Sequence, residues 1–199
     1  MKELTLADVL DLRAYERERE ARRAAVIELK RKRRVGIGPI VTVVFENRAT
    51  MLFQVQEMAR AEKMITDEQV QHELDVYNPL LPGPGEISMT LFVELTSDAE
   101  LRHWLPRLVG IERSVLLRVG GAEVRASVDP AHDAQLTRAE TTASVHYVRI
   151  ALDEPLAAGF AAQPAAIAID HPEYSHSVAL SEETRESLAA DWRDEEPVG

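Results

Sequence analysis

Three of the six histidines have neighbours that suit metal binding: His146, His171 and His176. Imidazole nitrogens with a carboxylate commonly bind zinc, iron or manganese, because the nitrogens offer directional lone pairs and the carboxylate offsets the cation's charge. The carboxylates that could complete such a set are Glu94, Asp170 and Glu173. The pattern predicts a divalent transition-metal site with the ligands His146, His171, His176 and Glu94.

Two other interpretations of these histidines stay open. His146 can be a hydrogen-bonded core residue while the other two lie in a surface loop, because this spacing does not impose a geometry as HExxH does on a helix. An enzyme is also possible, since a metal-bound water or a free imidazole can act as a base near neutral pH.

A second set of polar residues lies on two successive predicted helices. These residues are Gln54, Glu57, Arg60, Glu73, Tyr77 and Asn78. Amide, carboxylate and guanidinium groups on adjacent helices can form a ligand-binding pocket or a buried polar network. The alternative is that Glu57 and Arg60 form an exposed ion pair of little energetic value.

A basic segment precedes both sets, and residues 13–34 contain ten of the 23 Lys and Arg residues. Its end could dock an acidic protein partner through Lys30, Arg31, Arg33 and Arg34. Nucleic acid is the less favoured partner, because the net charge is -11 and Tyr15 is the single aromatic residue there for stacking. The alternative is a solvated helix end, where cations stabilise the negative pole of the helix.

Apolar periodicity and capping residues predict the elements that position these groups. Helices are expected over residues 5–12, 13–34, 49–64, 67–78, 97–110, 153–162 and 181–192. Strands are expected over residues 40–46, 87–95, 114–119, 122–128, 142–152 and 165–170. Gly120 and Gly121 predict a hairpin, because both turn positions can take a positive φ.

Hairpins without a regular alternation of strand and helix indicate an α+β fold. We expect a mainly antiparallel sheet with helices packed on one face, in a single domain over residues 1–180. An acidic helix and tail follow over residues 181–199. We expect this tail to fold back near the basic helix and to be held by burial of Trp192, because surface ion pairs contribute little.

Composition excludes several classes of protein. The 199 residues contain no cysteine, so disulfides, zinc ribbons and thiol catalysis are excluded. Neither a membrane-spanning apolar run nor a signal-peptide pattern is found, and we expect a cytoplasmic protein without membrane contact. There is no Walker loop, no G-x-G-x-x-G after a strand and no G-x-S-x-G nucleophile elbow.

Several motifs together resemble a bacterial family known as domain of unknown function 3501, over about residues 4–176. They lie at residues 30–35, 38–39, 45–50 (FENRAT), 54–60 (QVQEMAR), 73–79 (ELDVYNP), 144–147 (SVHY) and 170–172 (DHP). Genes of this family often neighbour those of rubrerythrin and an iron–sulfur oxidoreductase. The resemblance therefore implies a role in peroxide or redox stress, with such redox proteins as partners, and it assigns no catalytic residue.

The leading hypothesis combines the histidines with this resemblance. It is an accessory protein of oxidative-stress or redox metabolism that binds a metal or small ligand through its histidines. The alternatives are an interaction module that docks a partner on the basic helix, and a metal-dependent or histidine acid/base enzyme. Homo-oligomerisation is left open by the sequence.

Overall fold

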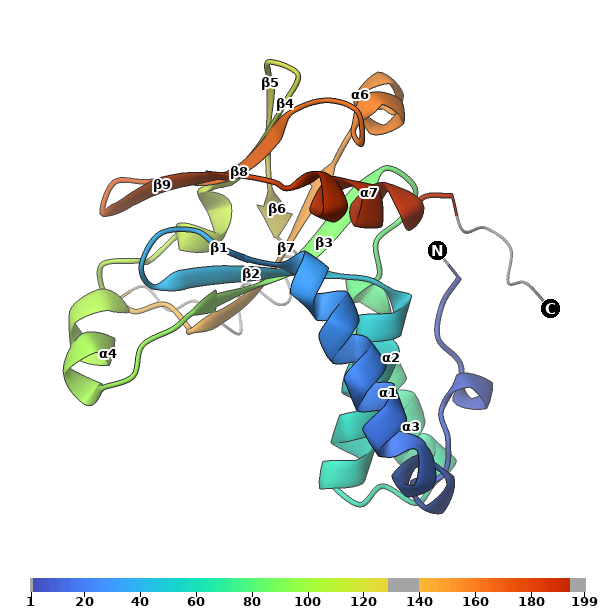
Figure 1. Ribbon diagram of the computed structural model, residues 1–199. Coiled ribbons are helices and arrows are strands. Elements are labelled where there is room, and N and C mark those ends of the chain that lie inside the picture. The colour runs from blue at the N-terminus through green and yellow to red at the C-terminus, as the bar shows by residue number, and fades with distance from the viewer. Residues whose placement is uncertain (1, 129–139, 194–199) are drawn as a thin grey trace.

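The computed structural model describes residues 2–128 and 140–193 (Figure 1). Its helices are η1 (Leu6–Asp8), α1 (Leu12–Arg33), α2 (Arg48–Ala61), α3 (Asp67–Tyr77), η2 (Asn78–Leu80), α4 (Asp98–Trp104), η3 (Ile111–Arg113), α6 (Glu154–Gly159) and α7 (Glu182–Ala190). Its strands are β1 (Arg34–Gly36), β2 (Val41–Glu46), β3 (Glu86–Val93), β4 (Val115–Val119), β5 (Ala122–Arg125), β6 (Ser127–Val128), β7 (Val145–Ala151), β8 (Ala165–His171) and β9 (Tyr174–Ala179).

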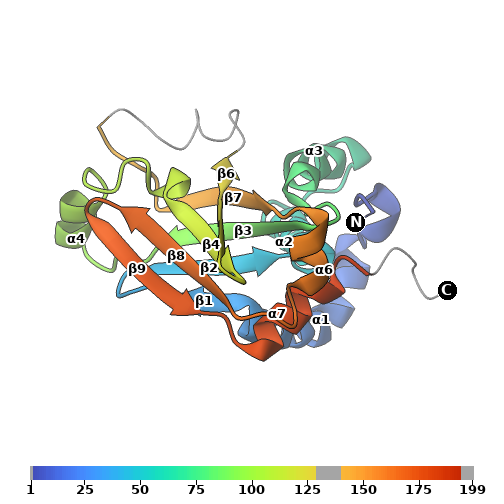
Figure 2. The same ribbon diagram turned by 90° about the horizontal axis from the view of Figure 1, so that it is seen from above.

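The strands form two antiparallel sheets. One sheet has the order β1-β2-β3-β7-β6 and the other has the order β5-β4-β8-β9. Figure 2 shows the strands of the second sheet crossing above those of the first. The α+β class and the antiparallel pairing are thus confirmed, while the division into two sheets was not predicted.

The main hydrophobic core lies between the two sheets. Val43 and Leu91 come from the first sheet, Leu117 and Ile167 from the second, and Leu188 from α7. Each of them is at most 3% exposed. Because α7 contributes to this cluster, the C-terminal helix packs on the core as well as on α1.

A second hydrophobic cluster joins α2 to α3 and the N-terminal segment. Its buried members are Leu4, Met51, Val55, Leu74, Tyr77, Leu80 and Leu81. Figure 1 shows α1, α2 and α3 projecting together on the side of the first sheet away from β8 and β9. We call η1, α1, α2 and α3 the helical end of the molecule.

Local capping signals decide where several elements begin and end. Thr5 and Asp8 form a capping box, but the element they start is the short 3-10 helix η1. Asn47 caps α2 and Thr66 caps α3. The helix predicted over residues 97–110 ends at Trp104, because Pro106 has no N–H to continue the ladder.

Two short strands escaped prediction. Strand β1 is the continuation of the basic segment and pairs with β2 through Val35 and Val43. Strand β9 pairs with β8 and carries Ser175, His176 and Ser177, whose exposed polar side chains resemble a loop. Both are edge strands, where one side of the backbone has no ladder partner and hydrophobic patterning is weak.

In the described ranges, no helix combines the length and the apolar character needed to cross a membrane.

Candidate functional site

The structure places the three predicted histidine ligands on two sheets. His146 lies in β7 of the first sheet, whereas His171 ends β8 and His176 lies in β9 of the second. Across residues 2–128 and 140–193, no group of three His, Asp or Glu side chains could hold a metal ion. The described structure therefore does not gather the predicted metal ligands into one centre.

His146 is 2% exposed and is held by its own strand end. Its Nε2 lies 2.9 Å from both Thr142 Oγ1 and the Ala143 carbonyl oxygen. Because a carbonyl can only accept, this contact places a proton on Nε2. Its Nδ1 lies 4.0 Å from Glu112 Oε2, an oxygen without a hydrogen-bond partner among the described residues. A buried carboxylate thus lies beside a buried imidazole, and one of its oxygens has no donor among the described residues.

The other predicted ligands also have partners within the chain. His171 Nε2 lies 3.1 Å from the Val109 carbonyl, and its Nδ1 accepts from the Glu173 N–H at 3.2 Å. Neither nitrogen retains a lone pair for a metal in this conformation. His176 packs against Tyr174, and the centroids of the two rings lie 4.5 Å apart.

Glu94 is engaged at both oxygens. It accepts hydrogen bonds from Thr42 Oγ1, at 2.8 Å, and from the guanidinium of Arg34. A metal ion at Glu94 would have to displace both donors.

The polar residues of α2 and α3 hold the N-terminal segment in place. Glu57 accepts from Tyr15 Oη at 2.6 Å and from Arg19 Nε and Nη2 at 2.8 Å each. The hydrogen bond from Arg19 is the main cause that lowers the pKa of Glu57 to about 2; burial opposes it, and the hydrogen bond from Tyr15 adds to the lowering. Arg60 pairs with Glu16.

Two amide side chains clamp the segment that precedes α1. Gln56 accepts from the Leu10 N–H at 2.9 Å and donates to the Leu10 carbonyl at 2.8 Å. Asn78 makes the same pair of contacts with Leu4, at 2.8 and 2.9 Å. These bonds fix the path of residues 4–10 across α2 and α3.

The three remaining members of the predicted ligand set, Gln54, Glu73 and Tyr77, also lie at the helical end. Burial raises the pKa of the Tyr77 hydroxyl, and a hydrogen bond with Gln54 offsets part of that rise. Glu73 is half-buried on α3. Among the described residues, these contacts join parts of the helical end to one another.

Most of the basic run is paired within the chain. Arg33 is 1% exposed and binds Asp191, Arg34 binds Glu94, and Arg31 binds Glu28. Lys30 is half-buried and is the one predicted partner-binding residue without an ion pair in the described ranges. Since Arg33 is inaccessible, the run does not present the four-residue cationic surface expected from the sequence.

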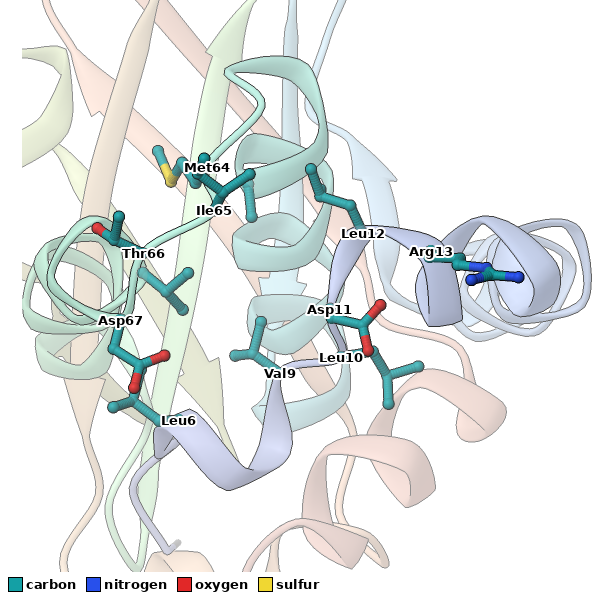
Figure 3. A pocket seen from close by; sticks show the side chains of 12 residues that line it. Leu6, Val9, Leu10, Asp11, Leu12, Arg13, Met64, Ile65, Thr66 and Asp67 are labelled. Carbon is teal, nitrogen blue, oxygen red and sulfur yellow. The ribbon is translucent and has the colours of Figure 1, made fainter.

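A groove that sequence reasoning missed lies between the N-terminal segment and the start of α3. Its volume is about 320 Å³, within the lower range of ligand and peptide pockets. It is lined by Leu6, Val9, Leu10, Asp11, Leu12, Arg13, Ala59, Met64, Ile65, Thr66, Asp67 and Val70. We call it the helical groove. Figure 3 shows Thr66 and Asp67 on one side of it, Asp11 and Arg13 on the other, and Val9 between them.

The apolar residues at the edge of this groove are exposed. Ile65 is 83% exposed and Leu6 is 36% exposed. Ile65 directly precedes the N-cap Thr66 and would usually pack on Val70, four residues into the helix, as a hydrophobic staple. An Ile so exposed can bury little surface there. The sequence signal that could have revealed the groove is thus an apolar residue before a capping box.

A second hollow adjoins the groove along α3. Its volume is about 460 Å³, and it is lined by Leu6, Asp67, Glu68, Gln71, His72 and Asp75. Leu6 and Asp67 line both hollows, so the two are adjacent. An apolar groove and an acidic face of a helix therefore meet at the helical end.

Comparisons with known proteins agree with the fold but assign no chemistry. Residues 3–192 match the sequence model of a family described as protein of unknown function (DUF3501). The chain is also similar to a solved structure, described as a novel protein of unknown function from Burkholderia pseudomallei K96243. The two share 36% sequence identity with a TM-score of 0.87, over 96% of this chain and 99% of that one. No curated protein matches the chain.

Proposed function

We propose that this chain, which belongs to DUF3501, a family of proteins of unknown function, is a binding module. In this proposal, the helical groove accepts apolar side chains of a partner protein. The observation that carries this proposal is Ile65, which is 83% exposed at the edge of an apolar groove. Apolar surface rimmed by polar residues is typical of protein interaction sites. A partner that covers Ile65 and Leu6 removes this surface from water.

The groove is better suited to binding than to catalysis. Of its polar lining residues, Asp11 accepts a hydrogen bond from the Ala14 N–H at 2.9 Å, and Thr66 caps α3. The Asp11 carboxylate and the Thr66 hydroxyl therefore each stabilise the start of a helix. No histidine or lysine lines the groove among the residues that the structure describes. The one hydroxyl among these lining residues, that of Thr66, is engaged in capping α3, and no imidazole or amine lies there to activate it.

The walls of the groove are held before any partner arrives. Gln56 fixes the backbone of Leu10, and Asn78 fixes the backbone of Leu4. Asp8, between these points, pairs with Arg48 at 2.6 Å. A preformed groove loses less conformational entropy on binding than a flexible segment does.

The test uses the absence of cysteine from the chain. Glu62, which is exposed and lies two residues before the lining residue Met64, is changed to Cys and labelled with a polarity-sensitive fluorophore. The probe is a helical peptide of about 18 residues with Leu at every third or fourth position and Gln elsewhere. We expect binding to shift the fluorophore's emission to shorter wavelength.

Two substitutions decide whether the groove is responsible. Ile65→Ser should weaken binding about tenfold or more, because burial of an Ile side chain contributes about 1.5 to 3 kcal/mol. Ile27→Ser is the matched control, since Ile27 is 45% exposed on α1 and does not line the groove. Equal binding by both variants, or no binding of the peptide by the unchanged groove, contradicts the proposal.

Metal binding through His146, His171, His176 and Glu94, and an accessory role in redox metabolism, stay separate hypotheses from the sequence. Elemental analysis of protein purified without a histidine tag tests the first. Metal that is lost on replacing His146 or His171 would support it, and a metal-free protein would contradict it.

A further inference from the structure

We infer that the partner of the helical groove is a cationic amphipathic helix, whose apolar side chains enter the groove while its Lys and Arg residues face the acidic surface of α3. This inference rests on the proposed function and adds the chemistry of the partner. We call the surface formed by Asp67, Glu68, Gln71, His72 and Asp75 the α3 strip.

The α3 strip is a continuous exposed face of one helix. Glu68, Gln71, His72 and Asp75 follow one another at intervals of three, one and three residues, so they lie on one side of α3. All of them are exposed, as is Asp67 in the first turn. A partner that fills the helical groove next to Asp67 would therefore lie along these side chains.

The carboxylates of the strip lack cations. Within residues 2–128 and 140–193, Asp67, Glu68 and Asp75 form no ion pair; Asp75 accepts a hydrogen bond from Gln71 at 2.8 Å. Most other charges of the helical end are paired, as Glu57 is with Arg19 and Glu16 with Arg60. The strip is thus a negative surface without an internal counter-charge.

Helix stability explains only part of this charge. Asp67 and Glu68 lie in the first turn of α3, where the positive pole of the helix favours carboxylates. Asp75 lies in the last turn, which contains no basic residue, and there the helix pole disfavours a carboxylate. The position of Asp75 thus weakens α3 slightly and is explained better by a cation from outside the chain.

The geometry favours a helix over other occupants. The strip extends over nine residues of α3, about 12 Å, which a second helix can match with basic residues at the same spacing. A polyanion would be repelled by the strip. In a second copy of the chain, the longest helix with many basic residues is α1, and its exposed face mixes Arg17 and Arg23 with Glu16 and Glu20.

The experiment compares three peptides with identical Leu positions and with Lys, Gln or Glu at the polar positions. Binding is measured with the same fluorophore at Glu62→Cys, at about 50 mM and about 500 mM salt. We expect the Lys peptide to bind about tenfold more tightly than the Gln peptide at low salt, and the Glu peptide to bind most weakly. High salt should remove most of the difference.

Paired substitutions locate the charges. Glu68→Gln with Asp75→Asn should abolish the preference for the Lys peptide. Glu173→Gln with Glu182→Gln changes the net charge by the same two units at exposed positions outside the helical end, and should preserve the preference. If both pairs reduce the preference equally, the effect is one of total charge and the inference is wrong.

The outcomes separate the inference from the proposed function. Equal binding of the Lys and Gln peptides, both lost in Ile65→Ser, overturns the cationic partner and leaves the binding module intact. Binding that ignores Ile65→Ser overturns both. A third outcome is that the protein binds no peptide but forms a dimer, and that Ile65→Ser abolishes the dimer. The occupant of the groove is then a second copy of the chain, which contradicts a cationic helix.

Discussion

Arg33, 1% exposed at the end of α1, forms a two-pronged contact with Asp191 just after α7. Nη1 lies 2.7 Å from Oδ2 and Nη2 lies 2.8 Å from Oδ1. Arg33 Nε also donates to Ser187 Oγ at 3.0 Å, and Asn47 Nδ2 donates to Asp191 Oδ1 at 3.0 Å. One buried ion pair thus connects the C-terminal end of α1, the end of α7 and the N-cap of α2.

Asp191→Ala should lower the free energy of unfolding by about 3 kcal/mol or more, because it leaves the Arg33 guanidinium buried without its counter-charge. Urea unfolding followed by circular dichroism measures the change. Combining Arg33→Met with Asp191→Ala should recover part of the loss, since no charge is then buried. A double variant as unstable as the sum of the single variants would show that the two residues act independently.

Glu57→Gln should remove one component of the acid sensitivity of the fold. The hydrogen bond from Arg19 lowers the pKa of Glu57 from 4.5 to about 2, so the charged carboxylate stabilises the folded state fully above about pH 4.5. This contribution is lost as the pH falls through the folded pKa. At neutral pH the variant should be about 1 to 2 kcal/mol less stable, because the bonded group is charged in the wild type.

The measurement is urea unfolding of both proteins between about pH 3 and pH 7. The difference between them should be constant above about pH 5 and shrink at lower pH. Glu173→Gln, at an exposed position outside the helices, is the control for the loss of one negative charge. A difference that grew on acidification would have the wrong sign for a lowered pKa.

Sequence predicted the elements whose signals are local. Asn47, the Thr66 and Gln69 capping box, and the Gly120–Gly121 turn act through neighbours within a few residues, and the structure confirms all three. The core positions Val43 and Ile167 were predictable for a similar reason, because β-branched residues in short runs form buried strands. Val145, which lies near the start of the predicted strand over residues 142–152 and is also β-branched, is only half-buried.

Contacts between distant segments were beyond local patterning. Leu6 and Ile65 line the same groove because Gln56 and Asn78 hold the N-terminal backbone, and no spacing in the sequence encodes those bonds. The tail was predicted to pack near the basic helix, and α7 does so. The expectation that its ion pairs would be surface pairs is wrong for Arg33, which is buried.

Gly38→Ala should destabilise the connection between the two sheets. Gly38 has φ of 78°, and an added Cβ would lie 2.6 Å from both His176 Cγ and Tyr174 Oη. We expect the free energy of unfolding to decrease by about 1 to 3 kcal/mol, because of the strained backbone and the clash. Gly36→Ala is the matched control, since no atom lies within 4 Å of the new Cβ there, and a comparable loss in it would contradict the explanation.

Tyr174→Phe tests the same connection by removing one oxygen. Tyr174 Oη donates to the Ile37 carbonyl at 2.6 Å and accepts from the Ile40 N–H at 3.2 Å, so one hydroxyl from β9 fixes the turn between β1 and β2. Removal of the hydroxyl should lower the free energy of unfolding by about 1 to 2 kcal/mol, because it leaves a buried carbonyl without a donor. Amide hydrogen exchange should increase at Ile40 and in β1, while exchange in β4 stays unchanged.

The last prediction concerns what holds α7 on the molecule. Trp192 donates from Nε1 to the Glu86 carbonyl at 2.8 Å, and its ring lies 5.4 Å from that of Phe160. Glu183, at the start of α7, pairs with Lys32 at 3.0 Å, but both side chains are largely in solvent. Burial should therefore dominate, since exposed pairs contribute little and salt screens them.

Point variants test this better than truncation, because removal of α7 would also deprive Arg33 of Asp191. Trp192→Ala should lower the melting temperature by several degrees, by an amount that is nearly the same at about 50 mM and about 1 M salt. Glu183→Gln should change it little, and any change should vanish at high salt. If the decrease in melting temperature of Trp192→Ala disappeared at high salt, charge would hold α7 on the molecule. If the melting temperature did not decrease at all, Trp192 would not anchor α7.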